Sequence, residues 1–239
     1  MKREKEEKTG ETGGFAAGAA PGEPEGNAAG HPPSAGEIRA ALCQRHGEAV
    51  QEKLEQARVA VAGLGGLGSN VAFALARIGV GHLHLVDFDR VDLTNLNRQQ
   101  YFIRHLGLYK TDALRQELLD INPYLDVRTD CVKVTAENLQ ELFAEDEIIC
   151  EAFDVAEQKA MLVNGVLEAF PAKRLVAASG MAGFGDSNRI HTRKVTKNFY
   201  LCGDEETESA PGAGLMAPRV AVCAAHEANM IVRLILGDI

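Results

Sequence analysis

The sequence predicts an α/β protein with a doubly wound, mostly parallel, Rossmann-like sheet and an antiparallel C-terminal extension. Three observations support this prediction. An apolar run at residues 59–62 enters a glycine-rich turn, and an Ala- and Leu-rich helical pattern leaves it. The next apolar run, at residues 82–86, ends at Asp87, about 20 residues beyond the turn. Apolar runs then alternate with helical patterns, which is typical of parallel strands joined by helices.

The expected elements follow one another with short connections. A helical pattern opens at Ser34 or Gly36 and continues through Leu54, ahead of the first strand. Beyond the glycine turn we expect a helix to Ile78, a strand from His82, a helix over about 111–119, a strand from Leu125, a helix over about 136–143, a strand ending at Glu151, a helix over about 156–169 and a strand over 174–178. Antiparallel strands are expected beyond residues 190–195.

Composition indicates a single-domain cytoplasmic protein. The chain of 239 residues is 46% hydrophobic, which is enough for one sizeable core over residues 37–239. Residues 1–36 mix charge with Gly, Ala and Pro, so we expect a disordered tail there. No uncharged apolar run is long enough for a membrane span, and the charged amino terminus has no apolar core of a signal peptide.

The glycine turn is typical of a nucleotide site. Gly63 and Gly65 can adopt backbone angles that are closed to other residues, and Gly66 leaves room for a phosphate or a ribose. Gly68 lets the helix approach the strand closely. The carboxylate of Asp87 then falls where it can accept hydrogen bonds from both hydroxyls of a ribose.

The segment after Asp87 gathers acids, amides and cations in a non-periodic loop. Asp89, Asn95 and Arg98 lie in it, and Lys110 follows beyond Gly107. Arginine can hold phosphate oxygens in bidentate fashion, and lysine can add a point charge on a leaving pyrophosphate. The loop therefore favours a triphosphate ligand, and the alternative is a solvated loop with ordinary surface ion pairs.

These motifs resemble the ThiF/MoeB/HesA adenylyltransferases, the bacterial relatives of ubiquitin-activating enzymes. The resemblance extends from about Val59 to the C-terminus and is carried by Gly-Leu-Gly-Gly-Leu-Gly-Ser-Asn from Gly63, Asp-Phe-Asp from Asp87, Asn-Leu-Asn-Arg-Gln from Asn95, and Lys110. The short chain and its C-terminal motifs, Met-Ala-Pro-Arg-Val from Met216 and Ala-His-Glu-Ala-Asn from Ala225, look most like the compact ThiF branch of thiamine biosynthesis.

The resemblance implies that residues 37–239 form an ATP-binding adenylation domain. Such a domain joins AMP to the C-terminal glycine carboxylate of a ubiquitin-like sulfur carrier, here a ThiS-like protein, and releases pyrophosphate. By motif, Gly63, Gly65, Gly66 and Gly68 border the nucleotide with Asp87 and Asp89, and Asn95, Arg98 and Lys110 face the phosphates. Arg98, Lys110 and Asp154 would carry the catalysis, since cations and Mg²⁺ neutralise the charges that meet when a carboxylate attacks a phosphate.

Asp154 falls where the family keeps an acid that organises Mg²⁺. Many relatives read Asp-Cys-Thr-Asp-Asn there, whereas this chain reads Glu-Ala-Phe-Asp-Val from Glu151 and lacks the amide. Asp154 is therefore interpreted as the Mg²⁺ ligand, with a helix N-cap as the alternative or additional role.

The five cysteines are scattered and include no Cys-x-x-Cys pair, so we expect no structural zinc. Cys131, Cys150 and Cys223 lie in apolar runs and are expected to be buried. Cys202 precedes an acidic, Gly- and Pro-rich stretch and is expected in an exposed loop, where it is either a plain thiol or a nucleophile toward the carrier.

The expected partner is the sulfur carrier, without nucleic acid or membrane. A net charge of −9 argues against nucleic acid. A local basic patch either docks an acidic carrier or forms the polar face of an edge strand, and it comprises Arg189, His191, Arg193, Lys194 and Lys197. The glycines in residues 179–186 indicate either a channel for the Gly-Gly tail or a turn.

A homodimer is expected from the resemblance and from an apolar C-terminal helix that would need a partner surface. In relatives an N-terminal arginine reaches the ATP of the partner subunit, and Arg45 is the candidate here. Two other functions stay open. A nicotinamide-dependent oxidoreductase would leave Arg98 and Lys110 without a role, and a non-catalytic scaffold would not need them.

Overall fold

The computed structural model describes residues 32–210 and 214–238. Contacts divide the chain into Met1–Pro33 and Ser34–Ile239, and the helices and strands belong to the second unit. Most of the expected tail lies outside the described residues, as do residues 211–213 of the loop after Cys202. The first helix, α1 (Ala35–His46), already includes the last two residues that we assigned to the tail.

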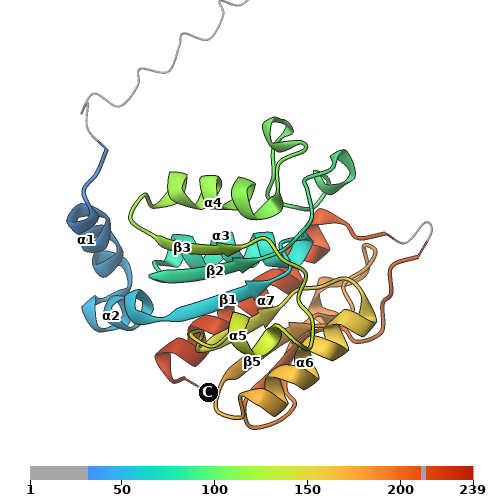
Figure 1. The fold of residues 1–239 in the computed structure, drawn as a ribbon. Coiled ribbons are helices and arrows are strands. Elements are labelled where there is room, and N and C mark those ends of the chain that lie inside the picture. Colours follow the sequence, from blue (N-terminus) through green and yellow to red (C-terminus); the bar gives the residue numbers. More distant parts are fainter. Residues whose placement is uncertain (1–31, 211–213, 239) are drawn as a thin grey trace, which may run out of the picture. The chain divides into compact units, whose positions relative to one another are not determined.

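A seven-stranded sheet forms the centre of the second unit (Figure 1). Its order is β3-β2-β1-β4-β5-β7-β6. The strands are β1 (Arg58–Ala62), β2 (His82–Val86), β3 (Asp126–Asp130), β4 (Ile148–Glu151), β5 (Arg174–Ala178), β6 (His191–Lys194) and β7 (Phe199–Gly203). Every neighbouring pair is parallel except β6 and β7, so the predicted mostly parallel sheet with an antiparallel extension is confirmed. Because β7 pairs in parallel with β5, the extension continues the main sheet.

Helices cover both faces of the sheet, as the doubly wound prediction requires (Figure 1). One face packs against α3 (Gly66–Ile78), α4 (Lys110–Ile121) and α7 (Ala217–Leu236), and the other packs against α5 (Leu139–Leu142) and α6 (Ala156–Ala169). Strand β1 is buried between these layers: Val59 and Val61 join the first core, whereas Ala60 and Ala62 join the second. Alternation along a strand sends successive side chains to opposite faces.

The helix expected from Ser34 or Gly36 to Leu54 is instead two helices. Gly47 separates α1 from α2 (Glu48–Gln56) and has φ +91°, which a residue with a Cβ rarely adopts. The predicted helix start at Ser34 is confirmed. The Ser34 side chain accepts a hydrogen bond from the Glu37 N–H, and the Glu37 carboxylate accepts one from the Ser34 N–H. A single glycine in an otherwise helical pattern gave too weak a signal of a break.

Other element boundaries agree closely with the sequence patterns. Helix α6 and strand β5 have the predicted bounds, while α5 is only four residues long. The expected start of α5 is a turn, because the side-chain oxygen of Asn138 accepts from the Thr135 N–H at 2.8 Å.

The C-terminal helix α7 buries its apolar face inside its own chain. Its buried residues, including Val220, Ala224 and Ile231, belong to the core shared with α3 and the sheet. The apolar pattern therefore needs no partner subunit, and that part of our argument for a homodimer is wrong. Within the described ranges, no helix combines the length and the apolarity that crossing a bilayer would take.

Candidate functional site

The glycine turn after β1 lies at the C-terminal edge of the parallel strands, and steric contacts explain two of its glycines. Gly63 has φ +91°, and a Cβ on it would lie 2.8 Å from the carbonyl oxygen of Ala152. A Cβ on Gly68 would lie 1.8 Å from the carbonyl oxygen of Gly63, so the close approach of helix and turn is confirmed. Gly65, the N-cap of α3, has φ −76°, so the unusual angle expected at both positions occurs only at Gly63.

Asp87 holds this turn in place. One carboxylate oxygen accepts from the Leu64 N–H at 2.7 Å, and the other accepts from the Asp89 N–H at 2.8 Å. The Tyr101 hydroxyl donates to the Leu64 carbonyl at 2.8 Å from the same buried surroundings. Each carboxylate oxygen can accept more than one hydrogen bond, so these contacts leave acceptor capacity for a ligand hydroxyl. Loss of the carboxylate would therefore disturb the turn itself as well as any ligand.

Arg98 packs on the first turn of α3. A Cβ on Gly66 would lie 3.3 Å from Arg98 Cγ and 3.0 Å from Val220 Cγ1, which shows how tightly the side chain covers this glycine. The guanidinium donates to the carbonyl of Thr94 and to the Asn97 side chain, at 3.2 and 2.8 Å. Among the described residues no carboxylate pairs with it, and its buried Nε has no acceptor. A cation with spare donors beside a helix N-terminus can bind an anion.

Lys110, the first residue of α4, points toward the same turn. Only 6% of the residue is exposed, and its Nζ lies 2.8 Å from Asp89 Oδ2 and 3.9 Å from Asp87 Oδ2. The ammonium charge is thus balanced by Asp89, whose side chain is half exposed. A ligand anion arriving here would compete with that carboxylate for the lysine.

Asn95 has a structural contact that its motif did not reveal. It ends the short helix η1 (Leu93–Asn95), and its side-chain oxygen accepts from the Asp92 N–H at 3.0 Å. The Asp92 carboxylate accepts in return from the Thr94 N–H and hydroxyl, which lowers the pKa of Asp92. The amide nitrogen of Asn95 remains as the group available to a phosphate.

Asp154 lies beyond the end of β4, exposed, at the same edge of the sheet. The alternative N-cap role is wrong, because the N-cap of α6 is Val155 and no side chain caps this helix end. No group of three or more His, Cys, Asp or Glu side chains within the described ranges could hold a metal ion. A single carboxylate still fits Mg²⁺, since this ion keeps several waters and is bound by one or two carboxylates together with substrate phosphates.

Glu151 is fully buried next to this edge. Its carboxylate accepts from the Phe153 N–H at 2.8 Å and pairs with Lys159 of α6 at 2.8 Å. Burial raises the pKa of Glu151, while the Lys159 ammonium acts in the opposite direction. The pair joins β4 to α6 and keeps the acid away from solvent, so Glu151 supports the edge from within.

Three thiols surround a second buried acid, Glu227 of α7. Cys150, Cys202 and Cys223 are buried, and burial raises the pKa of each, to about 12 for Cys202. Cys150 lies 3.7 Å from Glu227 Oε1, and burial also raises the pKa of Glu227 well above its usual range. The prediction for Cys202 is wrong: it belongs to strand β7 and not to an exposed loop. Its chemistry is that of an inert core thiol.

Burial was predicted correctly for Cys150 and Cys223 but wrongly for Cys131, which is exposed directly after β3. Arg45 is exposed in the last turn of α1. Helix α1 meets Gly79 at the opposite edge of the sheet, where a Cβ would lie 2.8 Å from Leu42 Cδ1. Within one chain Arg45 is therefore far from the glycine turn.

The predicted basic patch is partly neutralised by its own chain. Arg193 of β6 donates twice to the Glu205 carboxylate, at 2.6 Å each, and Arg189 pairs with Glu206. Glu205 has φ +59°, and it is the one non-glycine with positive φ among the described residues. The two acids follow β7, so the acidic loop folds back on the basic strand. Lys194 and Lys197 remain to give the patch a positive charge.

Residues 179–186 follow β5 and pack against the loop after β7. Gly180 has φ +80°, and a Cβ on it would lie 2.1 Å from Asp204 Oδ1. Gly183 begins a turn with φ +73° and open space around it. The glycines therefore serve a turn and a close backbone approach, as the plainer of the two sequence interpretations proposed.

Tyr101 and Asp204 were not identified from the sequence, and Arg219 was quoted only within the motif from Met216, although each ties segments of this edge together. Asp204 accepts from the N–H groups of Glu206 and Thr207, at 2.9 Å each, and pairs with buried Arg219. A buried arginine or aspartate leaves no periodic pattern in the sequence. The only indication was the position of Arg219 at the start of the last helical pattern.

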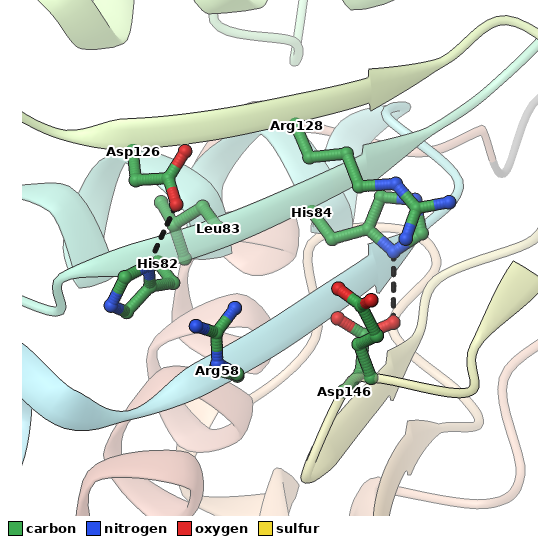
Figure 2. Close-up of a pocket in the computed structure, with 8 residues that line it drawn as sticks. Arg58, His82, Leu83, His84, Asp126, Arg128 and Asp146 are labelled. Carbon is green, nitrogen blue, oxygen red and sulfur yellow. Dashed lines mark hydrogen bonds and ion pairs between the residues drawn. The ribbon is translucent and has the colours of Figure 1, made fainter.

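A small polar cavity lies on the face of the sheet away from α3 and α4, as Figure 2 shows. His84 is one of the residues that line it, and its two ring nitrogens lie 2.8 Å from carboxylate oxygens of Asp130 and Asp146. Arg58, His82 and Asp126 also line it, at the beginnings of strands β1, β2 and β3. The cavity is therefore remote from the glycine turn, and both ring nitrogens of His84 already have carboxylate partners.

The strand order, the glycine turn after β1 and the acid after β2 define a doubly wound, Rossmann-like α/β protein. The model of the ThiF family matches residues 38–239, and the chain belongs to that family.

Curated relatives and solved structures agree with this family. The chain is 29% identical over 195 residues to an adenylyltransferase and sulfurtransferase of Culex quinquefasciatus, covering 79% of this chain and 44% of the relative. It therefore spans less than half the length of that protein. A tRNA threonylcarbamoyladenosine dehydratase of Bacillus subtilis is 35% identical over 149 residues, or 61% of this chain and 58% of the relative. The Escherichia coli dehydratase solved with ATP has the same fold, with a TM-score of 0.76, 23% identity and coverage of 84% and 94%.

Proposed function

We propose that this chain is an ATP-dependent adenylyltransferase that activates the C-terminal glycine carboxylate of a ubiquitin-like sulfur carrier. The observation that carries the proposal is Arg98, which lies on Gly66 with a buried Nε that has no acceptor and no carboxylate partner among the described residues. An arginine that is held in place but left without an anion favours an anionic ligand at the N-terminus of α3.

The proposed reaction needs charge neutralisation and no proton transfer. A carboxylate oxygen of the carrier attacks the α-phosphorus of ATP, the bond from that phosphorus to the bridging oxygen breaks, and pyrophosphate leaves with the electron pair. Arg98 and the N–H groups at the start of α3 stabilise the phosphoryl oxygens. Lys110 exchanges its Asp89 contact for the departing pyrophosphate, and Asp87 holds the ribose.

Magnesium is proposed as the partner of the triphosphate, with Asp154 as its protein ligand. The exposed carboxylate after β4 is suited to this role, because the remaining ligands come from phosphate and water. The ion would supply further neutralisation of the phosphate charge. Removal of Mg²⁺ with a chelator is expected to abolish exchange, and Asp154→Asn to raise the Mg²⁺ concentration needed for half-maximal rate.

The carrier is proposed to be a ThiS-like protein of thiamine biosynthesis, because of the C-terminal motifs from Met216 and Ala225. Lys194 and Lys197, beside the paired Arg189 and Arg193, would meet acidic groups of that carrier. A homodimer and a cytoplasmic location are part of the same proposal. Arg45 would act only across a dimer, because it is remote from the turn of its own chain.

A tRNA-modifying dehydratase is the second candidate, because a relative with that name is 35% identical over 149 residues. The net charge of −9 weighs against it, since binding of tRNA rests on phosphate contacts with basic side chains. The two candidates differ in the molecule that supplies the carboxylate, and one assay can compare them.

The test is ATP–pyrophosphate exchange by the purified chain with Mg²⁺, with a carrier ending in Gly-Gly, with the carrier lacking its last glycine, and with tRNA that contains threonylcarbamoyladenosine. Exchange that needs the intact carrier supports the proposal, and exchange that needs tRNA supports the second candidate. Arg98→Ala is expected to abolish exchange, while Arg77→Ala, on the exposed far end of α3, leaves it unchanged. ATP binding without exchange in any mixture would refute the enzyme and favour a scaffold.

A further inference from the structure

Phe184 is the most exposed large hydrophobic side chain among the described residues, at 86% of its surface. It lies between Gly183 and Gly185, in the turn that follows β5. An exposed aromatic ring gains nothing for folding, since the hydrophobic effect acts only when its surface is buried. A ring held out on a rigid turn is, by contrast, suited to be buried by a partner, because aromatic anchors carry much of the energy of protein interfaces.

The backbone around Phe184 is fixed from below by Arg219. The buried guanidinium donates to the carbonyl oxygens of Gly185 and Asp186, at 2.6 and 2.8 Å. On the other side of the ring, the Gly183 N–H donates to the Gly214 carbonyl at 3.0 Å. The residues that flank Phe184 are thus held on both sides, although the ring itself is free. A turn ordered in advance loses less entropy when it binds.

Arg219 is in turn fixed by Asp204. Their side chains form an ion pair and are 4% and 1% exposed. Burial alone would raise the pKa of Asp204, but the N–H groups of Thr207 and Glu206, the Thr207 hydroxyl and Arg219 outweigh burial and lower this pKa to about 2. The carboxylate is therefore ionised at neutral pH. A cation in the first turn of a helix opposes the helix dipole, so Arg219 is not explained by the stability of α7.

The position of this turn connects it to the proposed reaction. Val220, the residue after Arg219, contacts Gly66, where a Cβ would lie 3.0 Å from Val220 Cγ1. Consecutive residues of α7 therefore contact the two turns: Arg219 holds the turn with Phe184, and Val220 covers the glycine turn. A partner that touches Phe184 therefore lies beside the helix end that reaches the glycine turn.

We propose that Phe184 is the anchor that binds the small carrier protein, and that Arg219 is a positioning residue that holds Phe184 in place. The occupant is an apolar depression on the carrier, next to the extended tail that delivers its carboxylate to the nucleotide. This inference rests on the proposed function. It adds a contact residue that no glycine or phosphate motif identifies.

The first test is the exchange assay at varied carrier and ATP concentrations. Phe184→Ala is expected to raise the KM for the carrier by about 10- to 30-fold, with kcat and the KM for ATP unchanged. Tyr124→Ala removes another exposed aromatic, 54% exposed between α4 and β3, and is expected to change neither KM. An unchanged carrier KM in Phe184→Ala would overturn the proposal.

The second test separates positioning from general stability. Arg219→Gln is expected to raise the carrier KM to a similar degree, and the double variant with Phe184→Ala to be no worse than Phe184→Ala alone, because both changes remove one contact. Arg219→Lys keeps the charge but loses the planar guanidinium with its several donors. Its KM for the carrier should therefore lie between those of the wild type and Arg219→Gln. Additive effects in the double variant, or an equal loss of ATP affinity, would overturn the positioning role.

Amide hydrogen exchange distinguishes failure of this inference from failure of the proposed function. In Arg219→Gln the amides of residues 183–186 are expected to lose protection while those of α3 keep it. Carrier binding to the wild-type chain, followed by its weakening in Phe184→Ala, tests the anchor even if no exchange of pyrophosphate occurs. If the wild type exchanges pyrophosphate and Phe184→Ala binds the carrier with undiminished affinity, the anchor role of Phe184 is refuted. The proposed adenylyltransferase function would not be affected by that result.

Discussion

Substitution of Gly68 by alanine tests the close approach of α3 to the glycine turn. The added Cβ would lie 1.8 Å from the carbonyl oxygen of Gly63, with Val61 Cγ1 at 3.0 Å. Close carbon–oxygen contacts in proteins need about 3.3 Å, so backbone must retreat by about 1.5 Å. The obstructing atom belongs to a turn that Asp87 and Tyr101 also hold, and it has no flexible side chain to give way.

The magnitude follows from two opposing terms. Overpacking costs about 1–3 kcal/mol, and the backbone contact indicates the upper end of this range. Alanine returns about 1 kcal/mol through its better helix propensity, which leaves a net loss of about 2 kcal/mol. For a chain of this size the loss corresponds to a Tm lower by about 4–8 °C.

Thermal unfolding followed by circular dichroism measures the effect, with Gly36→Ala as the matched control. Gly36 is also in a helix, but nothing lies within 4 Å of the position of its Cβ. Its replacement should leave Tm unchanged or raise it slightly, by up to about 1 kcal/mol in stability. A Gly68→Ala protein that melts at or above the wild-type temperature would refute the steric reasoning.

Three further outcomes follow from the described contacts. The low pKa of Asp204, about 2, means that its contribution of about 2 kcal/mol is complete above about pH 5 and is mostly lost by about pH 2. Urea unfolding between pH 7 and pH 2 should therefore show that the difference in unfolding free energy between wild type and Asp204→Asn shrinks as the pH falls. A difference that stays constant with pH would contradict this role of Asp204. Thiol labelling of the native protein at pH 8 should modify Cys131 rapidly and Cys202 only on unfolding, and fast labelling of Cys202 would show that it is not buried. Tyr101→Phe leaves the buried Leu64 carbonyl without its donor and should cost about 1–2 kcal/mol, and an unchanged urea midpoint would argue against that hydrogen bond.

Much of the fold was predictable because its signals are local. Apolar runs between helical patterns marked the central strands β1, β4 and β5, and helix α6 and strand β5 have the predicted bounds. The break at Gly47 was missed, because a positive φ is decided by how α1 and α2 pack and not by the residues around the glycine. The same limit explains Cys202, which became core through the parallel pairing of β7 with β5.

The candidate site was predictable as a set of positions but not as a set of contacts. Sequence spacing brought Gly63, Asp87 and Arg98 to one edge, since the ends of parallel strands meet there. Their hydrogen bonds depend on tertiary distances. Spacing did not indicate that Asp87 holds the Leu64 N–H, or that Asn95 caps a turn. The Arg219–Asp204 pair joins the first turn of α7 to the loop after β7, and sequence spacing did not indicate this pairing.

The central place of β1 also affects how the chain folds during synthesis. Strand β1 pairs with β2 on one side, but its other edge pairs with β4, where Val59 faces Ile148. Strand β4 leaves the ribosome roughly 90 residues after β1. Synthesis of that stretch takes about 5–20 s at typical rates. During that interval an apolar strand has one open edge, and open edges pair with other chains. Slow refolding and aggregation at high concentration are therefore expected of fragments that end before β4.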